Sequence, residues 1–116
     1  MPFLRMKTNL VISDDIARQV KKIMGQAIGI IPGKSEDSLF FILDDTCLIW
    51  RHGSDSEDAV YIEATAFATE DRVGYTEFSS FVATNLSEIL TIPLDNIYIQ
   101  YSDMPAWSVG DRLFIR

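Results

Sequence analysis

Two amphipathic helical patterns divide the chain into similar halves and limit how it can fold. The first follows Ser13, a good helix cap, and runs from Asp14 to about Ile28, with Asp14 at the positive end of the helix dipole. The second ends before Pro93. Each helix can bury only one face, so both need a common layer to pack on. The apolar positions of the second pattern are Phe78, Phe81, Val82, Leu86, Ile89 and Leu90.

Four segments have the pattern of β-strands and supply that layer. Residues 2–7 and 59–67 alternate in polarity, residues 39–43 are continuously apolar, and residues 97–101 close the second half. The order is therefore β-α-β twice. With right-handed crossovers, this predicts an α+β fold whose four-stranded mixed sheet carries two helices on one face. The length fits one domain, residues 1–116.

The second face of this sheet has no predicted cover. The segments 39–43 and 59–67 are too apolar to leave a whole surface in water. A closed cyclic assembly buries such a face without leaving another one free. We therefore expect a symmetric homo-oligomer.

The composition argues against several classes of partner. A net charge of −7 with scattered Lys and Arg does not suit a nucleic acid. No apolar run is long enough for a signal peptide or a membrane span, so we expect neither a membrane partner nor secretion. Cys47 is the single cysteine, and its apolar neighbours favour an inert core thiol. A reducing, cytoplasmic location fits.

Metal and cofactor motifs are missing from the sequence. His52 is the only histidine and lies in a predicted surface turn, so no multi-histidine site can form. The acidic residues lack calcium-loop spacing and read as solvated turns. No G-x-G pattern offers a phosphate cradle. We expect no metal and no cofactor.

Pro2 is the strongest candidate for a chemically reactive residue. Removal of Met1 would make it an amino-terminal secondary amine, and such a group titrates near pH ~7.7–8.0 before any burial or neighbouring cation lowers it further. A base with a pKa near the working pH suits proton abstraction next to a carbonyl. Alternatively, Pro2 only begins an edge strand, where its missing N–H does no harm.

Several motifs together resemble the tautomerase superfamily, and most closely its macrophage migration inhibitory factor and D-dopachrome tautomerase branch. The resemblance covers almost the whole chain. It is carried by Met1-Pro2-Phe3-Leu4 with Thr8-Asn9-Leu10, by Gly33-Lys34, by Asp95-Asn96-Ile97-Tyr98-Ile99-Gln100-Tyr101, and by Asp103-Met104 and Val109-Gly110.

The resemblance implies a homotrimer whose inward-facing sheets form a barrel, with active sites between neighbouring subunits. It implies that Pro2 is the catalytic base and that Lys34 holds a substrate carboxylate or an enolate oxygen. An ammonium there would stabilise the oxyanion of the transition state and help to keep Pro2 unprotonated. Without the family register, Lys34 reads as a solvated loop lysine.

The resemblance further implies substrate-binding roles for Tyr98 and Gln100, which share one face of the last predicted strand and could come from an adjacent subunit. Gln100 stands where the family more often has asparagine. Alternatively, Tyr98 is a rim tyrosine of the interface, and this alternative stays open.

Other positions depart from the family pattern. Ala66-Phe67-Ala68 replaces a Ser-Ile-Gly motif, which predicts that Phe67 projects into the pocket, and Asp111 replaces a tryptophan. Trp107 and Phe114 could wall an aromatic substrate site or pack against a neighbouring subunit.

Three functions remain open. The first is a cofactor-independent keto–enol tautomerase for a small keto or enol acid such as phenylpyruvate. The second is a catalytically weak trimer that serves as a ligand-binding or protein-interaction module, motivated by the changes at Phe67, Gln100 and Asp111. The third is dehalogenation or decarboxylation, for which no pocket arginine can be placed from the sequence.

Overall fold

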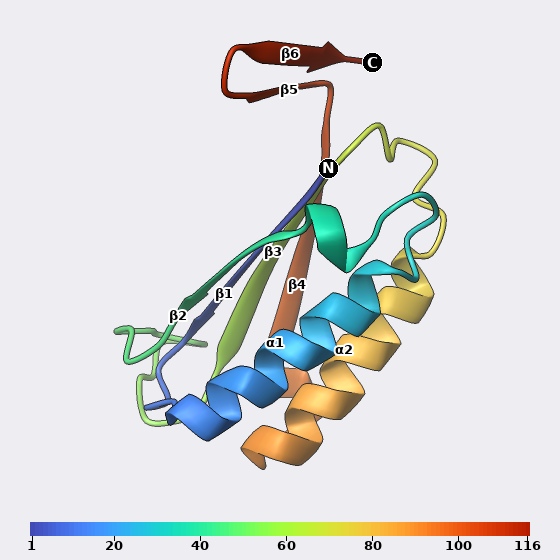
Figure 1. Ribbon diagram of the computed structural model, residues 1–116. Helices are drawn as coiled ribbons and strands as arrows, with labels where there is room; N and C mark the ends of the chain where they lie inside the picture. Colours follow the sequence, from blue (N-terminus) through green and yellow to red (C-terminus); the bar gives the residue numbers. More distant parts are fainter.

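The computed structural model describes residues 1–116 and has the two-layer architecture that the sequence predicts. A four-stranded sheet has the order β2-β1-β3-β4, and both long helices lie side by side across one of its faces (Figure 1). β1 and β3 are antiparallel at the centre, and each has a parallel outer neighbour. The elements are β1 (Pro2–Thr8), α1 (Asp14–Ile28), η1 (Glu36–Ser38), β2 (Phe40–Asp44), β3 (Val60–Phe67), α2 (Tyr75–Leu90), η2 (Leu94–Asn96), β4 (Ile97–Met104), β5 (Ala106–Val109) and β6 (Arg112–Ile115).

The helix boundaries follow local chemistry. The hydroxyl oxygen of Ser13 accepts a hydrogen bond from the N–H of Ile16 and caps α1, as predicted. α2 has no side-chain cap and begins at Tyr75, after Gly74 with a left-handed backbone (φ +88°). No helix in the chain has the length and apolar character to cross a membrane.

The core lies between the sheet and the two helices. β1 alternates strictly, so that every second side chain from Pro2 to Thr8 is buried under the helices. The opposite face of the sheet, here called the open face, is mixed in character, because Arg5 and Glu63 lie there among aromatic side chains. The largest fully buried side chains of the core are Phe78, Leu4, Met6, Met24, Ile62 and Leu86.

Two features differ from the sequence-based expectations. The tail after Met104 forms a β5–β6 hairpin that projects beyond the end of the sheet (Figure 1), whereas no strand was predicted there. The expectation of a core setting for Cys47 is wrong, since its side chain is only half-buried. Its neighbours Leu48 and Trp50 are 71% and 61% exposed, because this segment lies outside the helix–sheet sandwich.

Candidate active site at the chain start

In the folded chain, the side chain of Lys34 lies beside the amino terminus, although thirty-two positions separate Lys34 from Pro2 in sequence. After α1 the backbone turns at Gly33 (φ +77°), and the Lys34 N–H donates to the Ile31 carbonyl oxygen at 3.1 Å. The Lys34 ammonium donates a 2.8 Å hydrogen bond to the carbonyl oxygen of Phe67, the last residue of β3. The Phe67 N–H in turn donates to the Met1 carbonyl oxygen at 3.2 Å. These contacts bring Lys34 and the amino terminus together.

The surroundings of the amino terminus disfavour positive charge. Burial, and then the charge and hydrogen bonding of Lys34, hold the pKa of the Met1 α-amino group below its ordinary value of 8.0. Pro2 follows directly, with a side chain less than 2% exposed, and pairs with Ala66 across β1 and β3. The Met1 amine is therefore biased towards its neutral form.

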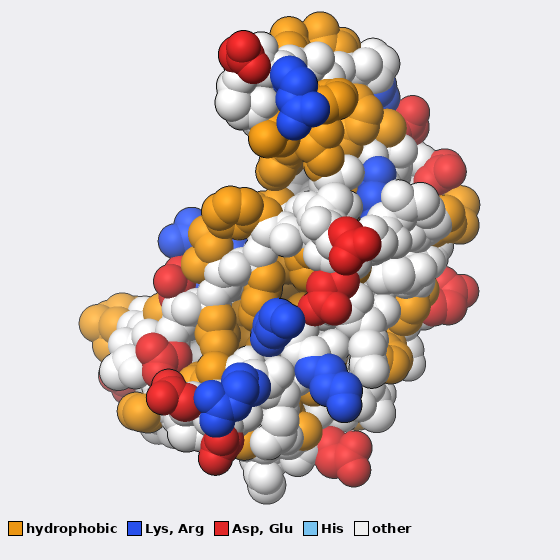
Figure 2. All heavy atoms as spheres, in the orientation of Figure 1, with side chains coloured by type: hydrophobic (Ala, Val, Ile, Leu, Met, Phe, Trp, Pro, Cys, Tyr) orange, Lys and Arg blue, Asp and Glu red, His pale blue; other side chains and the backbone are white.

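A cleft of about 450 Å³ opens next to Met1. Its wall on the body side comes from η1 and the start of β2, including Leu39 and Phe40. Its other wall is the projecting hairpin, whose Trp107 and Phe114 both line the cleft. Figure 2 shows the hollow between hairpin and body, with hydrophobic side chains on the hairpin's side of it. The arrangement suits a small molecule with an apolar or aromatic part.

The hairpin that carries this wall is fixed by pairing and by its last residue. Trp107 and Phe114 are cross-strand partners in the β5–β6 ladder. The guanidinium of Arg116 forms ion pairs with Glu70, at 3.0 Å, and with Asp103. The Asp103 carboxylate accepts a hydrogen bond from the Thr69 N–H, and this bond, with a smaller effect from Arg116, holds the pKa of the carboxyl below its ordinary value of 3.8. The hairpin is thus tied to both the β3–α2 loop and β4.

Sequence reasoning missed two charged residues of the cleft, Asp37 and Arg112. The guanidinium carbon of Arg112 lies 5.9 Å from the Phe114 ring centroid, which is within cation–π range. Nothing in the local sequence marks these two positions, because the hairpin and the η1 segment meet only in the folded chain.

Phe67 contributes to this region through its backbone. Its carbonyl oxygen binds Lys34 and its N–H binds Met1, as described above. Its side chain is not among the residues that line the cleft, so the expected bulk does not project into it in this subunit. Asp111 is exposed in the turn between β5 and β6.

Tyr98 and Gln100 lie elsewhere in the same subunit. Both are exposed on the open face of β4. Tyr98 pairs with Tyr61 of β3, whereas Pro2 pairs with Ala66. At ~3.3 Å per residue, positions 61 and 66 are roughly 17 Å apart along the strand. One subunit therefore does not bring Tyr98 into contact with its own Pro2.

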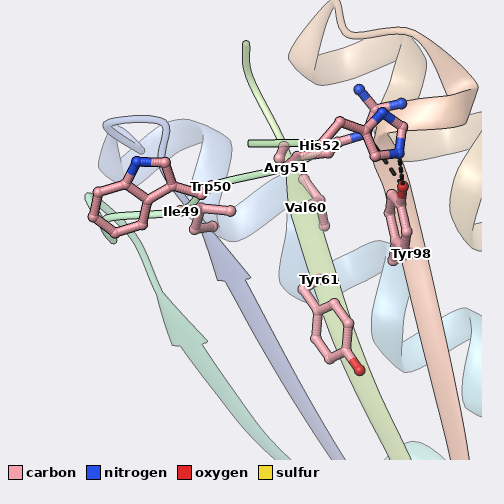
Figure 3. A pocket seen from close by; sticks show the side chains of 8 residues that line it. Ile49, Trp50, Arg51, His52, Val60, Tyr61 and Tyr98 are labelled. Atoms are coloured by element: carbon pink, nitrogen blue, oxygen red, sulfur yellow. Dashed lines mark hydrogen bonds between the residues drawn. The ribbon is translucent and has the colours of Figure 1, made fainter. Parts of the chain in front are cut away.

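A second pocket surrounds Tyr98 and has a volume of about 280 Å³ (Figure 3). Trp50, Arg51 and His52 approach it from the loop before β3, and Tyr61 lies beside Tyr98 with 6.5 Å between ring centroids. The Tyr61 hydroxyl donates a hydrogen bond to Oε1 of Gln100. The glycine at position 53 marks a turn in the sequence, but the contact of this turn with β4 exists only in the fold.

The chain brings together no group of three or more His, Cys, Asp or Glu side chains that could hold a metal ion. The chemistry available near the chain start is that of an amine, an ammonium and an aromatic wall.

Comparison with known proteins places these features in a wider context. A sequence model of the family described as macrophage migration inhibitory factor (MIF) matches residues 1–112. A search of curated protein sequences gives no match.

Solved structures match the fold over nearly its whole length. Leishmania major MIF2 is 20% identical with a TM-score of 0.87, covering 98% of this chain and 97% of that one. A macrophage migration inhibitory factor homologue from Prochlorococcus marinus is 22% identical with a TM-score of 0.83, covering 97% and 98%. A third protein, solved after inactivation by 2-oxo-3-pentynoate, is 12% identical with a TM-score of 0.80, covering 93% and 90%. At these identities the likeness shows the fold.

Proposed function

The chain belongs to the macrophage migration inhibitory factor family, and we propose that, with Met1 removed, it is a cofactor-independent keto–enol tautomerase whose general base is the nitrogen of Pro2. The observation that carries the proposal is the contact between the chain start and Lys34. Burial and Lys34 together lower the pKa of the Met1 amino group, and a freed Pro2 nitrogen would meet the same cation at this end of β1. A base that is neutral at the working pH can accept a proton from carbon.

In the proposed reaction, the Pro2 nitrogen takes a proton from the carbon next to the carbonyl of a 2-oxo acid such as phenylpyruvate. The electron pair of that C–H bond moves to the carbonyl oxygen as the enolate forms, and the prolyl ammonium then returns the proton to that oxygen. No electron acceptor or other co-reactant is needed. The reverse sequence converts the enol to the ketone.

Lys34 would bind the substrate carboxylate or the enolate oxygen. An ammonium has three donors, and the 2.8 Å bond to the Phe67 carbonyl uses one of them. This bond fixes the direction of the ammonium while leaving donors for a ligand. A fixed cation stabilises the developing oxyanion without having to reorganise during the reaction.

Trp107 and Phe114 would hold the aromatic or apolar end of the substrate. Both line the cleft beside Met1. The third wall of the site would come from a neighbouring subunit, since Tyr98 and Gln100 lie on the open face and away from their own Pro2. A homotrimer with the open faces turned inward would bring them to the Pro2 of the next copy.

Two further observations support parts of this proposal. A protein of the same fold was solved after inactivation by 2-oxo-3-pentynoate, and this supports a 2-oxo acid as the class of substrate here. The free Cys47 thiol supports the proposed cytoplasmic location, in which thiols stay reduced.

A second candidate function is a ligand-binding or protein-interaction module with little catalysis. The exposure of Leu48 and Trp50 favours it, since two large apolar side chains so close together can form part of a binding surface. In the trimer proposed above, the same side chains would be available to bury between subunits.

One experiment separates the two candidates. Tag-free protein is prepared, removal of Met1 is confirmed by intact mass, and phenylpyruvate tautomerisation is followed for the wild type and for Pro2→Gly. We expect the processed wild type to be at least about a hundredfold faster, the usual contribution of a positioned general base. Equal rates would reject the tautomerase and favour the binding module.

A further inference from the structure

Two side chains from a single turn contact the hydroxyl of Tyr98, and the proposed reaction has so far given these contacts no role. Nε of Arg51 donates a hydrogen bond to the Tyr98 hydroxyl oxygen at 3.3 Å, and Nε2 of His52 lies 3.4 Å from the same oxygen. Figure 3 shows both side chains reaching over the end of the Tyr98 ring. The guanidinium carbon of Arg51 is 5.8 Å from the ring centroid.

Arg51 is unusually well fixed for an arginine in a loop. Its side chain is only 16% exposed. Nη1 binds the Glu57 carboxylate at 2.7 Å, and Nη2 donates to the Asp95 carbonyl oxygen at 3.3 Å. Its backbone pairs with Ser54 in both directions across the turn. Removing a guanidinium from water is costly unless its donors are paired, so these partners define one orientation.

The direction of the hydrogen bond between Arg51 and Tyr98 is fixed by chemistry. An arginine side chain can only donate, so the Tyr98 oxygen must be the acceptor. The phenolic proton of Tyr98 is then available for donation to another acceptor. Nε2 of His52 fills this role in the tautomer that carries the ring proton on Nδ1, at a distance longer than the ~2.5–3.0 Å usual for an O–H donor. A better acceptor on the open face could replace it at little cost.

We propose that Arg51 is a positioning residue that presents Tyr98 as a hydrogen-bond donor to the enolate oxygen of a substrate bound at the Pro2 site of a neighbouring copy. Arg51 would hold the phenol oxygen and polarise its O–H bond, while His52, in the tautomer that accepts at Nε2, would accept this O–H until a ligand replaces it. The inference rests on the proposed tautomerase and assigns Tyr98 a catalytic contact rather than an interface role.

The test is a double-mutant cycle with Arg51→Gln and Tyr98→Phe, with phenylpyruvate as the substrate. If Arg51 acts through the Tyr98 hydroxyl, Arg51→Gln lowers kcat about tenfold in the wild-type background, a coupling of normal size for residues in contact. It then has no further effect in the Tyr98→Phe background. KM changes less than kcat, because the hydrogen bond strengthens as the oxyanion develops.

Two further variants make the cycle decisive. Arg18→Gln removes a highly exposed arginine that also pairs with a carboxylate, Asp15, and we expect no effect on kcat. Arg51→Lys keeps the positive charge next to Glu57 but loses Nε, so it should also lower kcat. It can replace Arg51→Gln in the cycle if Arg51→Gln fails to fold.

The outcomes distinguish this inference from the proposed function. Equal losses from Arg51→Gln with and without the Tyr98 hydroxyl would show a purely structural role and overturn the inference alone. Full activity of Arg51→Lys would overturn it as well. If Pro2→Gly is as fast as the wild type, the tautomerase proposal fails, and this inference fails with it.

Discussion

The Lys34 ammonium and the Phe67 carbonyl oxygen are joined by a 2.8 Å hydrogen bond that links the loop after α1 to the end of β3. The Phe67 N–H binds Met1, so one residue of β3 holds both the lysine and the chain start. After removal of Met1, the Lys34 bond to Phe67 and the pairing of Pro2 with Ala66 would still set the relative position of the proposed base and cation through backbone groups of this central strand. Such groups move less than side chains on a free loop.

Lys34→Met should weaken substrate capture. If Lys34 contacts the substrate carboxylate equally in the ground and transition states, KM rises about tenfold or more, while kcat changes little when it is measured at a pH where the base is fully neutral in both proteins. Steady-state kinetics with phenylpyruvate measure both values. A matched change of an exposed lysine, Lys22→Met, should leave both unchanged, since Lys22 lies on the outer face of α1. A loss confined to kcat would instead place Lys34 at the enolate oxygen.

The amino group of the chain that retains Met1 should titrate below 8.0, because burial and Lys34 disfavour its ammonium form. Lys34→Met removes the second cause and should move the midpoint upward. The pH dependence of amino-terminal acetylation, followed by peptide mass, measures this midpoint. An unchanged midpoint in the variant would contradict the contact.

The same shift has a consequence for folding. Between the lowered pKa and 8.0, the unfolded chain binds more protons than the folded one, so the free energy of unfolding rises with pH through this window. Below the lowered pKa, the folded chain carries the full free-energy cost of its disfavoured Met1 ammonium. Lys34→Met should make this part of the stability profile shallower, as measured by urea unfolding at a series of pH values.

Gly74→Ala should destabilise the fold more than Gly110→Ala. Both glycines have positive φ, so alanine is strained by about 1 kcal/mol or more at either position. At Gly74 an added Cβ would also lie 2.8 Å from the Ile30 carbonyl oxygen, whereas at Gly110 it would meet nothing within 4 Å. Denaturant unfolding of the two variants gives the difference directly. Equal losses of stability in the two variants would mean that the backbone near Ile30 shifts away from the added Cβ at no cost in free energy.

Trp50→Asp should break the proposed assembly. Trp50 is 61% exposed in the subunit and borders the open-face pocket around Tyr98. If that face is buried between copies, a carboxylate there would be desolvated and would oppose association. Sedimentation of the wild type should give three times the 13.1 kDa chain mass, and the variant should be lighter. Val11→Asp, at an 81% exposed loop position, should assemble normally.

Much of the fold follows from local patterns. The Ser13 cap and the spacing of apolar residues predict α1 with its observed bounds, and the partial alternation of residues 2–7 predicts that Leu4 and Met6 share one side of β1. These signals are readable because a helix or strand that packs on one side must repeat with its own period. The β5–β6 hairpin was missed because its strands are short and lack an alternation of buried apolar and exposed polar residues. Its apolar residues Leu113 and Ile115 are exposed.

The sequence by itself determined the two β-α-β halves and the side of each element that faces the core, because periodicity and capping act over a few neighbouring residues. Only the tertiary structure decided which distant groups meet: Lys34 with the chain start, Arg116 with Asp103, and Arg51 with Tyr98. These contacts depend on strand order and register and on the paths of connecting loops. Such features are set by packing of the whole chain, and no local pattern encodes them.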